Sequence, residues 1–475
     1  MKSSRFEVLS SDEIRSIHDS SMHILTRIGL KIEYDEARTL LAENGATIKD
    51  DGVTVLLTPE LVDEMLARVP ASFSMSGPDG TFKFDVSTEG TIFASQGSPT
   101  KVFDEQDPRM PRDATLDDFV KYIRIMDSLQ YISSTHLDVW PVDMPYEDMH
   151  VRTMTEWGKW SRKPFGMGCR GRAMSQDLMN LARIIIGDQD DLETNPRLIA
   201  FYNPISPLRL PHDLTEGLMV FADNKQPIII APAACGGTTA PVTIAGLLAQ
   251  TNAEILATLV VAQLRSPGSP VLYGCVNSVM DPYTANVAWG SVETGLITAA
   301  AAQLARHYNI PSRAAGAITN ANQFDMQNGI ERFMTLFAAA SAGINYITCA
   351  GTYASILASS LELLEIDDDL AGIMLRWKDG IAVNDETLAL DQIETIANTP
   401  SKAFLTLKHT RTYARKEIFV PPLSTRLSVD SWIAKGMPSL LENARARVRE
   451  VLSRDDAPRL SQETMDRLAR YIKEK

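Results

Sequence analysis

Short apolar runs recur along the chain from about residue 90, and each is followed by a polar stretch and then a helical pattern. The eight runs cover residues 91–95, 131–135, 164–169, 198–202, 227–232, 270–276, 313–318 and 345–350. The helical patterns cover residues 116–129, 148–160, 176–186, 213–222, 243–264, 292–308, 325–342 and 355–377. Such alternation is typical of parallel strands joined by helices. Eight repeats predict an α/β protein with a closed (β/α)8 TIM barrel. An open doubly wound sheet is the alternative, but no GxGxxG motif follows the first run.

The two flanking regions carry other patterns. Near the N-terminus, Ser10 and Glu13 are spaced as a capping box, and Thr58 precedes Pro59 at the start of a second helix. Beyond residue 380, helical patterns at 386–399, 432–452 and 462–473 surround a basic segment at 403–415. We therefore predict a mainly helical N-terminal cap (1–90), a barrel (91–380) and a helical C-terminal extension (381–475). The extension would pack outside the barrel or against a neighbouring subunit, so we expect a homo-oligomer.

Composition narrows the classes of partner and compartment. The 475 residues include 60 acidic and 46 basic ones, a formal charge of −14, so we expect no nucleic-acid partner. No run approaches the ~18–20 apolar residues that span a bilayer, and the first residues lack an export signal. We expect a cytoplasmic protein with no membrane association. Cys169, Cys235, Cys275 and Cys349 lie far apart. A thiolate zinc site is geometrically conceivable, but no close-spaced ligand pair supports it, so we predict no metal.

A barrel of this kind carries its site at the C-terminal ends of its strands. The loop after the fifth run, ACGGTTAP, contains Gly236, Gly237 and Thr238 and opens a long helix. Glycines allow backbone amides to approach a ligand closely, and amides at a helix N-terminus favour an anion. These three residues are candidates for binding a carboxylate. The alternative is a tight glycine turn without a ligand.

The loop after the seventh run, ITNANQFDMQ, is rich in amides. We take Asn320, Asn322 and Asp325 as candidate catalytic residues and Gln323 as a candidate substrate contact. An Asx turn that also caps the next helix would explain the same residues.

His136 follows the second run and stands two residues before Asp138. This spacing allows a general acid–base pair, with His136 as a candidate catalytic residue. A hydrogen-bonded structural histidine is the alternative.

Aromatic residues near the predicted strand ends could attract a quaternary ammonium group by cation–π interaction. They are Trp140, Tyr146, Tyr202, Trp289, Phe324 and Tyr353. As candidate substrate contacts we select Trp140, Tyr202 and Tyr353, together with Gln96 after the first run. Ordinary packing is the alternative for each ring.

Several of these segments closely resemble the trimethylamine methyltransferase family. They include GGTTAPVTIAGLLAQTNAEILATLVVAQLRSPGSPVLYG, NPISPLRL, NANQFDMQNGIERF, SSLELLEIDDDLAGIMLR and HILTRIGLKIEYDEARTLLAENGA. The resemblance covers about residues 10–455. It implies a (β/α)8 barrel that passes a methyl group to the Co(I) of a separate corrinoid protein, so a cognate corrinoid protein is the expected partner. It also implies that this chain itself holds no tightly bound cofactor.

Founding archaeal members of the family carry pyrrolysine and demethylate trimethylamine, whereas this chain has only standard residues. It therefore resembles the branch that uses quaternary amines. A tertiary amine would have to leave as an amide anion, whereas a quaternary ammonium leaves as a neutral amine and needs no acid. Within that branch the chain is most similar to the enzymes that use glycine betaine, so the resemblance implies methyl transfer from glycine betaine, giving dimethylglycine and methyl-Co(III). Alternatives are another donor (carnitine, proline betaine or γ-butyrobetaine), a barrel lyase or isomerase using His136 and Asp138, or a non-catalytic betaine-binding protein.

Overall fold

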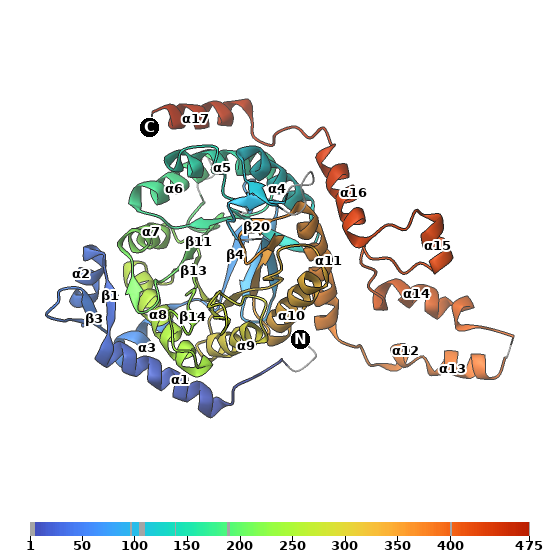
Figure 1. The fold of residues 1–475 in the computed structure, drawn as a ribbon, viewed down its shortest axis with the longest axis horizontal. Helices are drawn as coiled ribbons and strands as arrows, with labels where there is room; N and C mark the ends of the chain where they lie inside the picture. The colour runs from blue at the N-terminus through green and yellow to red at the C-terminus, as the bar shows by residue number, and fades with distance from the viewer. Residues whose placement is uncertain are drawn as a thin grey trace.

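Eight parallel strands form a closed barrel in the computed structural model, which describes residues 5–95, 97–103, 110–137, 139–187, 191–399 and 401–474 (Figure 1). In chain order they are β6 (Ile92–Ser95), β9 (Ile132–His136), β10 (Phe165–Gly168), β11 (Leu198–Tyr202), β13 (Ile228–Ile230), β15 (Val271–Cys275), β17 (Ser312–Ala315) and β18 (Tyr346–Ala350). Each pairs with the next in chain order, and β18 pairs with β6 to close the ring. The predicted (β/α)8 barrel is confirmed.

The eight helices of the barrel are α4 (Leu116–Ser128), α5 (Tyr146–Trp160), α6 (Arg172–Ile186), α7 (His212–Asp223), α8 (Ile244–Arg265), α9 (Val292–His307), α10 (Met326–Ala342) and α11 (Leu361–Asp379). Side-chain caps start several of them: Thr115 caps α4, Ser291 caps α9 and Ser360 caps α11. Helix α11 begins at Leu361 rather than at residue 355, because residues 354–356 adopt left-handed backbone before it.

The barrel interior is filled from its N-terminal end. Strands β4 (Ser72–Ser76) and β5 (Lys83–Ser87) form a hairpin whose Met75 and Val86 are fully buried. These two side chains join an apolar cluster with Ile199, Ile229 and Leu272 of the barrel strands. Ser76 also hydrogen-bonds through its backbone to Pro196, just before β11 begins. The hairpin therefore plugs the end of the barrel where the strands start.

The N-terminal region packs on helix α8. It contains α1 (Ser11–His23), a short π-helix (Ile24–Ile28), α2 (Asp35–Glu43) and α3 (Pro59–Arg68), with strands β1 (Leu30–Ile32), β2 (Thr47–Ile48) and β3 (Thr54–Leu56). The loop after β11 contributes β12 (Arg209–Leu210) to this small sheet. Among the described helices, only α8 is long and apolar enough to cross a membrane, and most of its apolar stretch is buried. It is the core helix that joins the N-terminal region to the barrel.

Besides β12, six short strands lie in the described loops that follow the barrel strands. They are β7 (Lys101–Val102), β8 (Arg112–Asp113), β14 (Cys235–Gly236), β16 (Ser278–Val279), β19 (Thr352–Tyr353) and β20 (Ala358–Ser359). Strand β14 pairs with β16, and β20 pairs with both β19 and β7. These pairings link the loop after β13 to the loop after β15, and the loop after β6 to the loop after β18.

The C-terminal region begins with a segment that leads away from the barrel (Figure 1). It carries α12 (Asp385–Leu388), α13 (Leu390–Ala397), a 3-10 turn (Phe404–Thr406), α14 (Lys408–Glu417) and α15 (Val429–Ala434). The chain then returns: α16 (Leu440–Leu452) packs on α11 and α4, and α17 (Gln462–Lys473) packs on α6. The single helix predicted over 432–452 is wrong, because left-handed Gly436 and the following Pro438 separate α15 from α16.

Candidate functional site

A cavity of about 220 Å³ opens at the C-terminal ends of β9, β10 and β11. Two aromatic rings, Trp140 and Phe201, and one histidine, His136, line it. Three methionines (Met149, Met167 and Met174), Arg170 and Asn203 also contribute. None of the described lining residues carries a carboxylate. The cavity thus offers polarisable and aromatic surface with one cationic group at its edge.

His136 lies deep in this cavity. Its imidazole is 1% exposed, and Nε2 lies 2.9 Å from the hydroxyl of Tyr346 on β18. Burial, with a further contribution from the charge of Arg313, lowers its pKa to about 3. A ring with so low a pKa is neutral at pH 7 and cannot supply a proton there. The geometry therefore favours a positioning role over the predicted acid–base role, and the proposed partner Asp138 lies outside the described residues.

Arg313 on β17 adds a buried positive charge beside the cavity. Its side chain is 1% exposed, and its guanidinium carbon lies 4.7 Å from the centre of the Phe201 ring, the same ring that lines the cavity. One Nη donates to the Cys275 carbonyl at 3.3 Å, and the other donates to the hydroxyl of Thr348. Burial lowers the pKa of Arg313, but guanidinium groups stay protonated in proteins. Sequence reasoning did not select this residue, because nothing in an apolar strand pattern marks which polar side chain faces the lumen.

Trp140 and Arg170 form the rim of the cavity. The Trp140 ring stacks on Tyr146, with centroids 5.7 Å apart and planes 22° apart. The guanidinium of the exposed Arg170 lies 5.9 Å from the centre of the Trp140 ring. Trp140 was selected from the sequence, whereas Arg170 was not. Its position directly after β10 is a signal that could have found it.

The glycine-rich loop after β13 forms a tight turn. The N–H of Gly237 donates to the carbonyl of Ala240, and the N–H of Thr238 donates to the carbonyl of Cys235. Gly236 belongs to β14, which pairs with β16. Gly237 has a φ of +95°, which explains the glycine there. Since the amides of Gly237 and Thr238 are already hydrogen-bonded, this loop matches the ligand-free turn rather than the expected carboxylate site.

The amide-rich loop after β17 holds neighbouring loops together. Asn320 accepts from the N–H of Gly290 at 2.7 Å and donates to the carbonyl of Val287 and the hydroxyl of Ser355, both at 2.8 Å. Its three bonds link the loops that follow β15, β17 and β18. The geometry gives Asn320 a structural role rather than the expected catalytic one.

The other three candidates of this loop lie on the surface. Asp325 caps helix α10 by accepting from the N–H of Asn328, and its second oxygen accepts from Gln323. These backbone and side-chain hydrogen bonds lower the pKa of Asp325. Asn322 and Gln323 are exposed and do not line the mouth cavity. The structure therefore matches the capping alternative and does not bring these residues to the cavity.

Two of the predicted aromatic contacts face away from the cavity. Tyr202 is fully buried on the helix side of β11, where its hydroxyl lies 2.9 Å from Thr215 on α7. Its neighbour Phe201 faces the lumen instead, because adjacent side chains of a strand alternate. Tyr353 is 3% exposed and packs edge-on against Phe324, 5.0 Å between centroids, in a separate cluster. Gln96 lies outside the described residues.

Backbone strain is concentrated at the same rim. Ala354, Ser355 and Ile356 have φ values of +49°, +59° and +66°, and Cys349 in β18 has +80°. Left-handed backbone is unfavourable for any residue with a Cβ and most of all for a β-branched one. The N–H groups of Ala354 and Ser355 hold the turn by donating to carbonyls of the loop after β17. Strain of this kind clusters at functional sites.

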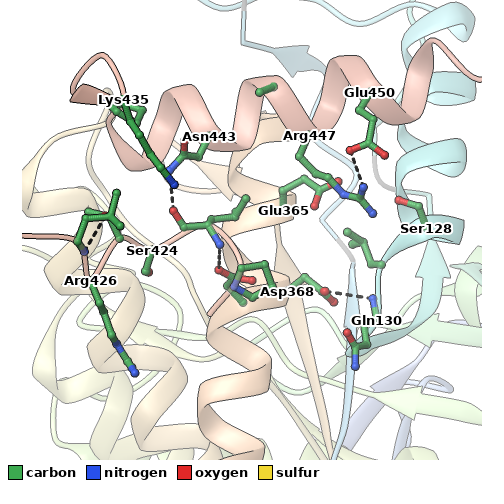
Figure 2. A pocket seen from close by; sticks show the side chains of 18 residues that line it. Ser128, Gln130, Glu365, Asp368, Ser424, Arg426, Lys435, Asn443, Arg447 and Glu450 are labelled. Carbon is green, nitrogen blue, oxygen red and sulfur yellow. Dashed lines mark hydrogen bonds and ion pairs between the residues drawn. The ribbon is translucent and has the colours of Figure 1, made fainter. Parts of the chain in front are cut away.

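A larger cavity, about 720 Å³, lies elsewhere (Figure 2). It is formed by α11, α16, residues 422–438 and the segment before β9, so it sits near the starts of the strands rather than their ends. Glu365, Asp368 and Asp369 of α11 line it together with Arg447 of α16. No group of three or more His, Cys, Asp or Glu side chains among the described residues is placed to hold a metal ion. Active sites of such barrels lie at the C-terminal ends of the strands. The smaller cavity lies there, so it is the candidate active site.

The whole chain, residues 1–475, matches the family described as trimethylamine methyltransferase (MTTB). The chain belongs to this family. It is 30% identical to a glycine betaine methyltransferase of Desulfitobacterium hafniense, over 98% of this chain and 97% of the relative. It is 26% identical to a proline betaine:corrinoid methyltransferase of Eubacterium limosum (98% and 97% covered) and 29% identical to the trimethylamine methyltransferase MttB of Methanosarcina barkeri (94% and 90%). The chain is thus a methyltransferase.

A solved structure supports the same fold. The monomethylamine methyltransferase MtmB of Methanosarcina barkeri superposes with a TM-score of 0.54 at 13% identity, covering 94% of this chain and 89% of that one. In this methyltransferase, the segments that resemble the family have partly structural roles. Glu254 of α8, for example, accepts from the Ser206 hydroxyl and the Leu208 N–H, which fixes the NPISPLRL loop. Such motifs mark the fold of the family as much as its chemistry.

Proposed function

We propose that this methyltransferase moves a methyl group from glycine betaine to the Co(I) of a corrinoid protein in the cytoplasm. The observation that carries the proposal is the charge of the mouth cavity. It is lined by aromatic rings and methionines, its histidine is neutral, and the guanidinium groups of Arg170 and Arg313 lie against the two lining rings. The full-length similarity to a glycine betaine methyltransferase supports the same assignment.

The reaction needs little from the protein beyond binding and orientation. The electron pair of Co(I) forms the new bond to the methyl carbon, the C–N bond breaks, and its electrons stay on nitrogen. Dimethylglycine leaves as a neutral tertiary amine, so no proton has to be supplied. The chain's task is to exclude water, hold the trimethylammonium group and present one methyl at the mouth. A neutral His136 and a described lining without carboxylates suit that task.

The two arginines favour a betaine over a simple methylammonium ion. A cation without a carboxylate would be repelled by Arg170 and Arg313, whereas the carboxylate of a betaine is attracted to them. The Trp140 and Phe201 rings can receive the ammonium end. The cavity of about 220 Å³ is smaller than the ~300–1,000 Å³ of sites for drug-sized ligands, which favours glycine betaine over the longer carnitine.

The test is methyl transfer to free cob(I)alamin, followed by the absorbance change on methylcobalamin formation. The panel contains glycine betaine, proline betaine, carnitine, γ-butyrobetaine, choline, tetramethylammonium and trimethylamine. We expect glycine betaine to react fastest and the three amines without a carboxylate to react at least ~10-fold more slowly, in line with the loss of one charge-assisted hydrogen bond. Equal rates with choline or tetramethylammonium would contradict the carboxylate argument. Absence of methylcobalamin with every compound would contradict the reaction itself.

Arg170→Gln and Arg313→Gln identify which guanidinium the carboxylate contacts. Substitution of the arginine that contacts the carboxylate should raise KM for glycine betaine and should leave KM for tetramethylammonium unchanged or lower it. Since Arg170 is exposed, its variant should fold normally. If neither substitution changes the preference for glycine betaine over tetramethylammonium, the arginines do not bind the carboxylate.

A further inference from the structure

The segment from residue 381 to residue 437, called the arm below, leaves the barrel and exposes most of its apolar side chains. Among its described residues only Pro421 and Leu423 are buried. The exposed ones, each at least 41% accessible, are Ile381, Val383, Leu388, Leu390, Ile393, Phe404, Leu405, Ile418, Val420, Leu427, Val429, Ile433 and Met437. Figure 1 shows the arm leading away from the barrel, on the side opposite α2. This is far more apolar exposure than isolated surface residues explain.

The arm is not stable as a separate unit. Its helices α12, α13, α14 and α15 contain 4, 8, 10 and 6 residues and none buries a side chain. Helices shorter than ~12–15 residues are marginal in water unless another surface covers their apolar face. The arm's described residues include thirteen exposed apolar side chains, compared with the ~20–30 residues of all kinds that one partner contributes to a standard interface.

A second exposed apolar surface lies on the barrel, on helices α10 and α11. Met326, Ile330 and Phe333 are 81%, 63% and 44% exposed and follow each other at helical spacing. Phe333 stacks on Phe337 at 5.7 Å, and Phe337 meets Trp377 edge-on at 5.3 Å. Trp377 is itself 57% exposed. We call these five side chains the α10 stripe. It continues from Trp377 directly into the root of the arm.

We propose that the arm of one chain covers the α10 stripe of a second copy, and that the second copy's arm does the same in return. The two surfaces belong to one chain, so reciprocal exchange satisfies both at once and closes with two-fold symmetry. The arm starts at the C-terminal end of α11, which lies at the start of the barrel strands. A corrinoid protein that accepts the methyl group has to bind at the opposite end of the barrel, where the mouth cavity opens. The position of the arm therefore favours a second copy over a methyl-accepting partner.

The first measurement is the mass of the full chain in solution by analytical ultracentrifugation. A single chain has a mass of 52.3 kDa, so the proposal requires twice that value or a multiple of it. Leu390→Glu with Ile393→Glu alters the arm, and Ile330→Glu with Phe333→Glu alters the stripe. Each pair should weaken self-association at least tenfold while circular dichroism stays that of the folded barrel. Ile28→Glu, an equally exposed apolar residue of the N-terminal region, is the control and should leave the mass unchanged.

Mixing the two double variants separates arm-to-stripe exchange from arm-to-arm pairing. In a mixed pair, the intact arm of the stripe variant can still meet the intact stripe of the arm variant. Mixing should therefore restore part of the dimer, which arm-to-arm pairing would not do. A full chain that stays monomeric at about 50 μM, in the range where weak homodimers associate, would overturn the proposal. So would a dimer that neither double variant weakens.

Hydrogen exchange on the unaltered chain gives a measurement that does not depend on how the variants fold. The amides of α13 and α14 should be protected at high protein concentration and exchange faster on dilution. Protection that is independent of concentration, or that appears only when a corrinoid protein is added, would also contradict the second-copy proposal. None of these measurements depends on which methyl donor the enzyme uses.

Discussion

Glu365 illustrates how a single buried carboxyl affects the stability of the fold. It is 7% exposed, and its Oε1 has no hydrogen-bond partner among the described residues. Burial raises its pKa to about 7, and the charge of Arg447 only partly opposes this. Figure 2 shows the side chain between α11 and α16, in the cavity that both helices line. Because the folded pKa lies above the unfolded one, the contribution of Glu365 is most favourable below pH 4.5 and is lost as the pH rises towards 7.

Glu365→Gln should therefore stabilise the protein at pH 8 and have little effect at pH 4.5. We expect a gain of about 1 kcal/mol at pH 8, or roughly 2 °C in Tm for a protein of this size, measured by thermal unfolding at both pH values. Glu442→Gln, on the same helix but outside the cavity, is the control, since hydrogen bonds from Ser439 lower the pKa of Glu442. The control should not stabilise at pH 8. A larger gain for Glu365→Gln at acidic pH would show that the sign is wrong.

Trp140 is one of the two aromatic residues that line the mouth cavity, and its ring lies at the cavity rim. Trp140→Ala should raise KM for glycine betaine about 2- to 30-fold, which corresponds to ~0.5–2 kcal/mol of cation–π interaction. Trp140→Phe keeps a ring and should lose less. Steady-state kinetics with free cob(I)alamin separates the two. If the phenylalanine variant loses as much as the alanine variant, the ring face does not hold the cation.

His136 distinguishes methyl transfer from acid–base chemistry. Its pKa of about 3 predicts that His136 itself adds no pH dependence to the rate of methyl transfer between pH 6 and 9, because its charge does not change in this range. A lyase or isomerase using this histidine would show a bell-shaped profile. A bell whose acid limb disappears in His136→Gln would contradict the role assigned here.

Site residues were harder to predict from the sequence than their loops. Parallel strands are apolar on both faces, so the sequence of β11 does not show that Phe201 faces the lumen and Tyr202 the helices. The loops that were selected do lie at the mouth, but their polar atoms serve caps and turns, as Asp325 and Gly237 show. Hydrogen bonds within a loop use the same residue types as ligand binding, so residue type alone does not separate the two.

At the scale of elements, three consecutive aspartates of α11 hold three different segments. Asp367 pairs with the buried Arg332 of α10 and accepts from the Gly351 N–H at 2.6 Å. Asp368 accepts from the N–H groups of Gln130, Tyr131 and Ile132 at 2.8–3.1 Å, which fixes the start of β9. Asp369 accepts from the Leu423 N–H at 2.9 Å and so ties the C-terminal region to the barrel. This helix is a junction between the barrel and its extension.

The three aspartates should differ in their importance for stability. Asp367→Asn leaves the charge of Arg332 buried without its counter-ion, which costs about 3–5 kcal/mol. Asp369→Asn weakens one hydrogen bond and should cost about 1 kcal/mol. Urea unfolding of both variants gives the comparison. Equal losses would mean that the ion pair contributes no more than a single backbone contact.

The elements themselves followed well from the apolar pattern. All eight barrel strands appear within a few residues of their predicted positions, because each is a short apolar run enclosed by turn residues. The errors have local causes. Helix α11 starts late because residues 354–356 form a strained turn that no propensity encodes. The break between α15 and α16 was readable in Gly436 and Pro438, whose signals the helical periodicity on either side obscured.

At the scale of the whole molecule, the eightfold repeat fixes where chemistry can occur. The strand ends, the strained turn and the mouth cavity lie at one end of the barrel. The carboxylate-lined cavity of Figure 2 and the root of the arm lie near the other end. Catalysis and the root of the arm are thus assigned to opposite ends, so substitutions in the arm should change association without reaching the mouth cavity of the same chain.

The hairpin of β4 and β5, whose Met75 and Val86 fill the barrel from below, has a kinetic consequence. Because the hairpin closes the end where the strands start, the small methyl donor and the larger methyl acceptor would both have to reach the site through the mouth of the barrel. The donor would bind before the acceptor, and the demethylated product would be released only after the acceptor has dissociated. Turnover would then follow a compulsory order. An excess of the methyl acceptor would bind to enzyme that has no donor in its cavity, block donor entry and so inhibit turnover.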